Sequence, residues 1–95
     1  MPELSTSAVP KVSFEVRRRR YGDETYLILK NEWYLLDEIS DRVWISCEEE
    51  LSIAWVSVVL SEALGIPLNE SVAASVATIL RFERLGLLEV VPALD

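Results

Sequence analysis

The residues of this chain that could carry out chemistry are of few kinds. Cys47 is the only cysteine, and there is no histidine. The chain therefore has no Ser/His/Asp triad, no Cys/His dyad and no ordinary zinc site, because each of these needs an imidazole as base or ligand. Cys47 is better explained as a small apolar filler of the core than as a reactive thiol. These residues predict a protein that is not an enzyme and that uses no cofactor or metal.

Carboxylates are plentiful, but their placement does not favour catalysis. Only Glu83 lies on the expected buried arc of a helix, and we interpret it as a rim residue or the partner of a nearby arginine. Sixteen acidic and nine basic residues give a formal charge of −7, which weighs against nucleic acid as a partner. Basic residues cluster in Arg17–Arg20 and in the pair Arg81 and Arg84. The first cluster is either a solvated strand end or a patch for an acidic peptide or partner.

The sequence contains no pattern for membrane insertion or secretion. No apolar run approaches the roughly 20 residues that span a bilayer. Residues 1–7 lack the basic region followed by an apolar one that marks a secretory signal. We expect a cytoplasmic protein without a membrane partner. Its single domain is expected over residues 12–91, between flexible tails at residues 1–11 and 92–95.

Three strands are expected in the first part of the domain. Apolar and polar residues alternate over residues 12–17, which predicts a strand with one buried face. A turn at residues 21–24 leads to a second strand over residues 25–30. Asn31-Glu32 then forms a tight connection to a third strand, Trp33–Leu36. If the second strand is central, one side of the third has no neighbour.

Three helices are expected next, each with its own start and stop signals. They are a helix capped by Asp37 that ends near Cys47, a helix capped by Ser52 that runs through Leu64, and a helix capped by Asn69 over roughly Glu70–Leu85. Gly65 and Gly86 end the last two, because glycine takes the left-handed conformation without steric cost. The expected inward faces consist of Ile39, Val43 and Trp44, of Ile53, Val56, Val59, Leu60 and Leu64, and of Val72, Val76, Ile79 and Phe82. Residues 87–91 form a last strand or an extended tail.

This order of elements predicts an α+β fold. Three helices with a three-stranded antiparallel sheet are typical of a winged helix-turn-helix arrangement. The strand Trp33–Leu36 is apolar on both faces, so its edge is either an aggregation hazard or a docking site for another chain. Ala74, Thr78 and Arg81 form a small polar stripe on the third helix, suited to lining a groove or to facing solvent.

Most of the chain resembles a known family. The resemblance is carried by the segments Leu36–Trp44, Leu51–Ile53, Leu60–Leu64 and Phe82–Leu88, which combine apolar spacing with a helix-ending glycine. Over about residues 12–91 the chain looks like the PqqD family, the recognition elements of ribosomal-peptide natural-product pathways. Its length, without a fused enzyme, is similar to that of the stand-alone leader-binding protein of bacterial lasso-peptide biosynthesis.

The resemblance implies a function and a site. Members of the family bind the leader segment of a precursor peptide and present it to a maturation enzyme, here a separate cysteine peptidase. The leader adds as a strand to the third strand and lies against the third helix. The peptide-binding site implied in this way consists of Trp33, Tyr34, Leu35, Leu36, Ala74, Thr78, Ile79 and Arg81. The resemblance leaves open which ring, Trp33 or Tyr34, faces the groove.

Three alternatives remain at this point. One is a PqqD-like peptide chaperone for a radical-SAM enzyme. Another is a winged-helix DNA-binding protein, although the amino-terminal half of the third helix, where bases would be read, has no basic residue. The third is a structural subunit of a larger assembly, which titration with candidate leader peptides would distinguish from a leader-binding protein.

Overall fold

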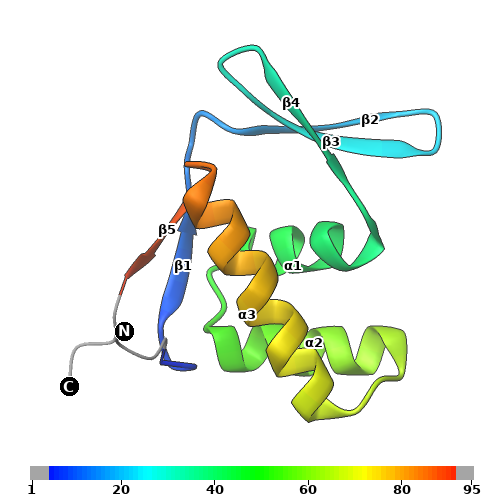
Figure 1. Ribbon diagram of the computed structural model, residues 1–95, viewed down its shortest axis with the longest axis vertical. Helices are drawn as coiled ribbons and strands as arrows, with labels where there is room; N and C mark the ends of the chain where they lie inside the picture. Colours follow the sequence, from blue (N-terminus) through cyan, green and yellow to red (C-terminus); the bar gives the residue numbers. More distant parts are fainter. Residues whose placement is uncertain (1–4, 92–95) are drawn as a thin grey trace.

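The computed structural model describes residues 5–91 and shows an α+β fold (Figure 1). Its elements, in chain order, are β1 (Val9–Val12), β2 (Arg17–Tyr21), β3 (Glu24–Leu29), β4 (Glu32–Leu36), α1 (Glu38–Glu48), α2 (Ile53–Leu64), α3 (Leu68–Arg84) and β5 (Leu88–Val91). Strands β2, β3 and β4 form an antiparallel sheet in that order, and β1 pairs antiparallel with β5. The expected arrangement, a three-stranded sheet followed by three helices, is confirmed.

Two tight turns, at residues 22–23 and 30–31, set the register of the three-stranded sheet. Lys30 and Asn31 have positive φ angles of 48° and 69°, as do the central residues of a type I′ hairpin turn. The sequence places this turn one residue later, at Asn31-Glu32, whereas Glu32 is the first residue of β4. Because β3 is central, β4 lies at an edge, as expected.

The first two helices begin and end where the sequence predicts. Asp37 caps α1, its carboxylate accepting a hydrogen bond from the Ser40 backbone N–H at 2.7 Å. Ser52 caps α2 by accepting from the Trp55 N–H at 3.3 Å. Gly65 then ends α2 with a φ of 66°, in the left-handed conformation.

The predicted start of α3 is wrong by two residues. The helix begins at Leu68 rather than after Asn69, and Pro67 occupies its N-cap position without a side-chain cap bond. The fixed φ of proline, here −59°, is compatible with a helix start. Its missing N–H costs nothing there, because the first N–H groups of a helix have no acceptor within the helix.

One hydrophobic core joins the helices and the strands. Its buried apolar residues are Ala8, Leu27, Leu36, Val43, Trp44, Cys47, Ile53, Val56, Leu60, Ile79, Phe82, Leu87 and Leu88. Trp44 and Phe82 meet edge to face, with ring centroids 5.4 Å apart and planes at 86°. The prediction that Val59 faces inward is wrong. The buried arc of α2 includes Ser57 instead, which leaves Val59 exposed on the flank.

The largest difference from the sequence-based expectation concerns the start of the domain. The alternation over residues 12–17 predicts a strand, but Phe14 lies in a turn and is 94% exposed. Two strands flank this turn instead, β1 before it and β2, the first strand of the three-stranded sheet, after it. Strand β1 lies mostly within the stretch expected to be a flexible tail. Its partner β5 comes from the other end of the domain, so no local pattern reveals the pairing.

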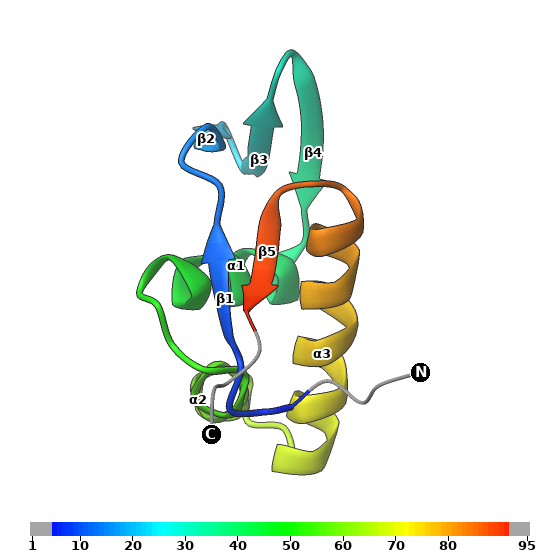
Figure 2. The same ribbon diagram turned by 90° about the vertical axis from the view of Figure 1, so that its left-hand side faces the viewer.

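The three-stranded sheet stands at one end of the helices (Figures 1 and 2). Leu27 and Leu36, on its inner face, are buried in the core. Arg18 on β2 also reaches α1, where its Nε and Nη2 donate to the two Asp41 oxygens at 2.6 and 2.9 Å. Such bidentate pairs fix geometry as well as contribute energy. These contacts hold β4 in place beside the carboxyl end of α3.

Within residues 5–91, no single helix is long and apolar enough to cross a membrane. Helices α2 and α3 have the required length and composition only when taken together, and a bend of 119° separates them.

Removing the cap of α1 should weaken the fold measurably. We expect Asp37→Ala to lower the free energy of unfolding by about 1 kcal/mol, because the Ser40 N–H loses its partner. Asp37→Asn should retain most of this stability, since an amide oxygen also caps a helix. Urea denaturation at neutral pH measures both changes.

The stability of the parent protein and that of Asp37→Asn should depend differently on pH. The Ser40 N–H, helped by the charge of Arg81, holds the pKa of Asp37 below its usual value of 3.8. The stability that this carboxylate contributes is therefore present above that value and is lost as the pH falls through the lowered pKa. Asp37→Asn should lose less stability than the parent on acidification, and equal losses would contradict the assignment.

Candidate functional site

Strand β4 has a neighbour on one side only. Along two antiparallel strands, residue pairs that exchange main-chain hydrogen bonds alternate with pairs that do not. In a hairpin with a two-residue turn, the pair that flanks the turn is a bonded one. Glu32 closes the turn, so Glu32, Tyr34 and Leu36 bond to β3. The N–H and C=O groups of Trp33 and Leu35 point to the other side, where no strand of residues 5–91 pairs with them. Two N–H and two C=O groups are thus available to an added strand.

The other edge of the sheet, β2, is protected by its arginines. The Arg19 guanidinium donates to the Arg18 C=O at 2.9 Å, and Arg20 Nε donates to the Gly22 C=O at 3.2 Å. A strongly charged edge, with the outward Arg18 C=O already bonded, resists pairing with an apolar strand. The two edges therefore differ in kind, and β4 is the one suited to an apolar guest.

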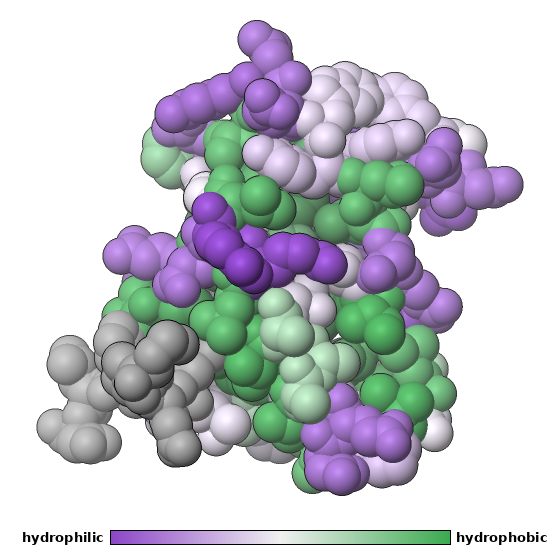
Figure 3. Space-filling view, viewed as in Figure 1, coloured by the Kyte–Doolittle hydropathy of each residue, from purple (hydrophilic) through white to green (hydrophobic). Residues whose placement is uncertain are grey.

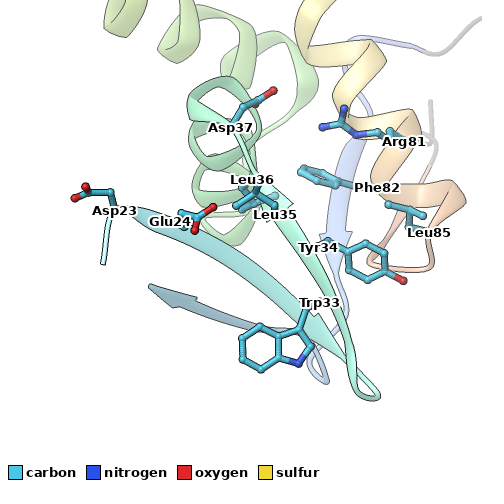
Figure 4. Close-up of a pocket in the computed structure, with 10 residues that line it drawn as sticks. All are labelled: Asp23, Glu24, Trp33, Tyr34, Leu35, Leu36, Asp37, Arg81, Phe82 and Leu85. Carbon is cyan, nitrogen blue, oxygen red and sulfur yellow. The ribbon is translucent and has the colours of Figure 1, made fainter. Parts of the chain in front are cut away.

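A groove of about 730 Å³ lies along the open edge, between β4 and the end of α3 (Figure 4). It is lined by Asp23, Glu24, Trp33, Tyr34, Leu35, Leu36, Asp37, Arg81, Phe82 and Leu85. On the face shown in Figure 3, hydrophobic residues lie on both sides of a strongly hydrophilic band that crosses the middle of the molecule. A strand added to β4 would lie in this groove.

The pleat of β4 separates its two aromatic rings. Tyr34 pairs with Leu27, whose side chain is in the core, and extends toward α3 and Leu85 (Figure 4). Trp33 points away from them, and its ring lies 5.4 Å from the Tyr21 ring and 5.6 Å from the Tyr26 ring. Tyr34 therefore faces the helix side of the groove, and Trp33 lies on the opposite face of the sheet.

Arg81 supplies a positive charge to the groove. Its guanidinium donates to the Ser40 hydroxyl and lies over the Phe82 ring, 5.9 Å from the centroid. Its charge also contributes to the lowered pKa of Asp37. No carboxylate of residues 5–91 forms an ion pair with it. Its remaining N–H groups are available to an acidic group of a guest.

Five of the eight residues expected to bind a peptide line the groove, namely Trp33, Tyr34, Leu35, Leu36 and Arg81. Ala74, Thr78 and Ile79 do not line it. Thr78 and Ile79 are buried in the protein interior, and Ala74 is packed against the core. The reason is that β4 meets α3 near the carboxyl end of that helix, beyond these residues (Figure 1).

The groove is also lined by residues that were not expected there, namely Phe82, Leu85 and the carboxylates Asp23, Glu24 and Asp37. The stripe of Ala74, Thr78 and Arg81 continues to Leu85 at the next helical step, so the groove is lined by the same face of α3 but closer to its carboxyl end. The hairpin register brings Asp23 and Glu24 to the end of β4, because Thr25 pairs with Leu36.

The described residues offer little reactive chemistry. No group of three His, Cys, Asp or Glu residues within residues 5–91 is placed to hold a metal ion. Cys47 is buried, which raises the pKa of its thiol to about 12. Glu83, exposed on α3, accepts a hydrogen bond from the Val90 N–H at 3.2 Å. It therefore supports the link between α3 and β5, outside the groove.

Comparison with known proteins supports the fold. No family model and no curated protein matches the sequence. Among solved structures, the chain is similar to TbiB1 in complex with the TbiA(beta) leader peptide, with a TM-score of 0.74 and 18% identity. The match covers 83% of this chain and 94% of that one. At this identity the likeness shows a shared fold.

The burial of Cys47 leads to a prediction about its reactivity. Iodoacetamide should label the native protein very slowly and the urea-unfolded protein rapidly, because only the exposed thiol ionises near its ordinary pKa of 9.0. The rate is measured by mass spectrometry of the intact chain. Rapid labelling under native conditions would show that Cys47 is accessible.

Proposed function

We propose that this protein binds an extended peptide segment as an added strand on β4. The observation that carries the proposal is the open edge of β4, which lies directly along an apolar-walled groove. The guest that we propose is the leader segment of a ribosomally made precursor peptide, of the lasso-peptide kind. The fold shared with TbiB1, which was solved with a leader peptide, supports this choice. The PqqD-like pattern of the sequence supports it as well.

The main-chain bonds alone would give weak binding. Trp33 and Leu35 offer four groups, and each hydrogen bond contributes about 0.5–1.5 kcal/mol net before the cost of ordering the guest. A micromolar complex needs about 8 kcal/mol. Buried apolar side chains of the guest must supply the difference, at about 1.5–3 kcal/mol each. We infer that affinity depends on side chains that enter the groove.

The groove predicts the pattern of those side chains. Alternate residues of an added strand point to the same face, so every second guest residue would meet Tyr34, Phe82 and Leu85. These positions should be apolar. A carboxylate of the guest near Arg81 would add up to about 1 kcal/mol and would serve selectivity more than affinity.

The role that we propose is capture and delivery rather than catalysis. In this role the protein holds the leader while a separate maturation enzyme, such as a cysteine peptidase, acts on the precursor. A partner of a radical-SAM enzyme would use the same groove, and the identity of the guest distinguishes the two. Calorimetric titration of the full chain with candidate leader peptides is the direct test, and failure of every apolar extended peptide to bind would overturn the proposal.

Proline substitution tests the added strand. We expect Leu35→Pro to abolish guest binding, because it removes an N–H group that points to the open edge. The bonds of Glu32, Tyr34 and Leu36 to β3 remain, so the helices should stay folded by circular dichroism. Arg20→Pro is the matched control, since by the same alternation it removes an outward N–H group from the opposite edge. Unchanged binding by Leu35→Pro would show that the guest does not pair with β4.

Tryptophan fluorescence should report the same event. Trp33 is 51% exposed beside the open edge, whereas Trp44 is buried and Trp55 lies on α2. In a Trp55→Phe variant, a bound guest should shift the emission to shorter wavelength because it covers part of Trp33. The shift should disappear when Trp33→Phe is added. A shift that persists without Trp33 would place the guest elsewhere.

A further inference from the structure

The three-stranded sheet has a second exposed surface, on its far side from the helices. Thr25 and Leu27 of β3 point inward and are buried, so their alternate neighbours point outward. The register then places on one face Arg17, Arg19 and Tyr21 of β2, Glu24, Tyr26 and Ile28 of β3, and Trp33 and Leu35 of β4. We call this set the outer face. Glu24, Trp33 and Leu35 also line the groove, but the outward residues of β2 and the other outward residues of β3 do not, and they stay uncovered when a peptide lies against α3.

Three aromatic rings form the centre of the outer face. The rings of Tyr21, Tyr26 and Trp33 form a triangle: the Trp33 centroid lies 5.4 Å from that of Tyr21 and 5.6 Å from that of Tyr26, and the two tyrosine centroids are 6.3 Å apart. Tyr21 is 54% exposed and Leu35 is 59% exposed. Rings that support one another lose little freedom on binding, which makes them good contact surfaces for other proteins.

Positive charge borders these rings. Four of the nine basic residues of the chain lie on β2, although the net charge of the chain is −7. Arg18 points inward and pairs with Asp41, but Arg17 and Arg19 point outward and form no ion pair within residues 5–91. Glu24 is the only carboxylate that the register places on the outer face.

We propose that the outer face docks an acidic segment of a second protein, one whose carboxylates alternate with apolar side chains. Charge complementarity identifies the occupant: Arg17 and Arg19 would meet the carboxylates, and the rings of Tyr21 and Tyr26 would meet the apolar side chains. Nucleic acid is disfavoured, because two outward arginines are few and the acidic remainder of the protein repels phosphates. This partner is distinct from the guest of the groove.

The test uses the full chain and a short synthetic peptide in which Glu alternates with Phe. Amide shifts in ¹⁵N NMR spectra should change along β2 and β3. They should change much less with a peptide in which Gln replaces Glu. Because an extended peptide could also lie in the groove, the titration is repeated in a Leu85→Glu variant. This change adds a carboxylate to the wall of the groove and leaves the outer face unaltered, so binding to the outer face should persist.

Matched charge variants locate the contact. Arg17→Ser combined with Arg19→Ser should weaken binding of the Glu peptide on the order of tenfold at low salt, the combined effect of two exposed ion pairs. Arg42→Ser combined with Arg84→Ser removes the same charge elsewhere and should change the affinity by less than about twofold. Neither pair lines the groove. Thermal unfolding verifies that both variants fold.

Several results would overturn the proposal. One is equal binding of the Glu and Gln peptides, and another is equal loss of affinity in the two charge variants. Shifts confined to β4 and α3, or loss of all binding in Leu85→Glu, would assign the peptide to the groove. A single-stranded oligonucleotide that binds the outer face more tightly than the Glu peptide would make nucleic acid the occupant. Outer-face shifts that depend on protein concentration alone would make it a second copy of the chain.

Discussion

The rest of the site depends on one constraint, which is that β4 pairs with a strand on one side only. Backbone N–H and C=O groups need a partner or water, and those of Trp33 and Leu35 have no partner strand within residues 5–91. The chain places this edge with little freedom. Asp37 alone separates β4 from α1, and the contacts of Arg81 with Ser40 and of Phe82 with Trp44 bring the end of α3 alongside. An open edge is thereby held rigidly beside an apolar wall.

An open edge is also an aggregation hazard, and the composition of the two edges shows how the protein limits it. The edge strand β2 is almost entirely arginine, and its side chains donate to the Arg18 C=O of the strand and to the Gly22 C=O of the turn that follows. The edge strand β4 is apolar and has no comparable protection. If both edges were mere structural remnants, the same protection would be expected on each. The contrast makes β4 the edge that is more open to an added strand.

The sequence predicted those parts of the fold that depend on local signals. Residue types within a few positions of each other predict the helix caps at Asp37 and Ser52 and the helix end at Gly65. The central position of β3 follows in the same way from the two short turns that flank it. The pairing of β1 with β5 joins the two ends of the domain, and a strand pattern does not name its partner. Only some of the residues that line the groove were expected there, for a similar reason. Periodicity identified the face of α3, but the crossing point of β4, which decides between Thr78 and Leu85, is a tertiary feature.

The position of one turn decides which atoms a guest would meet. With the turn at Lys30 and Asn31, the main-chain groups of Trp33 and Leu35 face the open edge. If the turn lay one residue later, Trp33 and Leu35 would bond to β3 and the groups of Tyr34 and Leu36 would face outward. The side chains would also exchange faces, because in a strand of L-residues the side to which the N–H and C=O point fixes the face on which the side chain lies. The positive φ values at Lys30 and Asn31 thus accompany a register that selects both the main-chain groups offered at the edge and the ring, Tyr34, that faces α3.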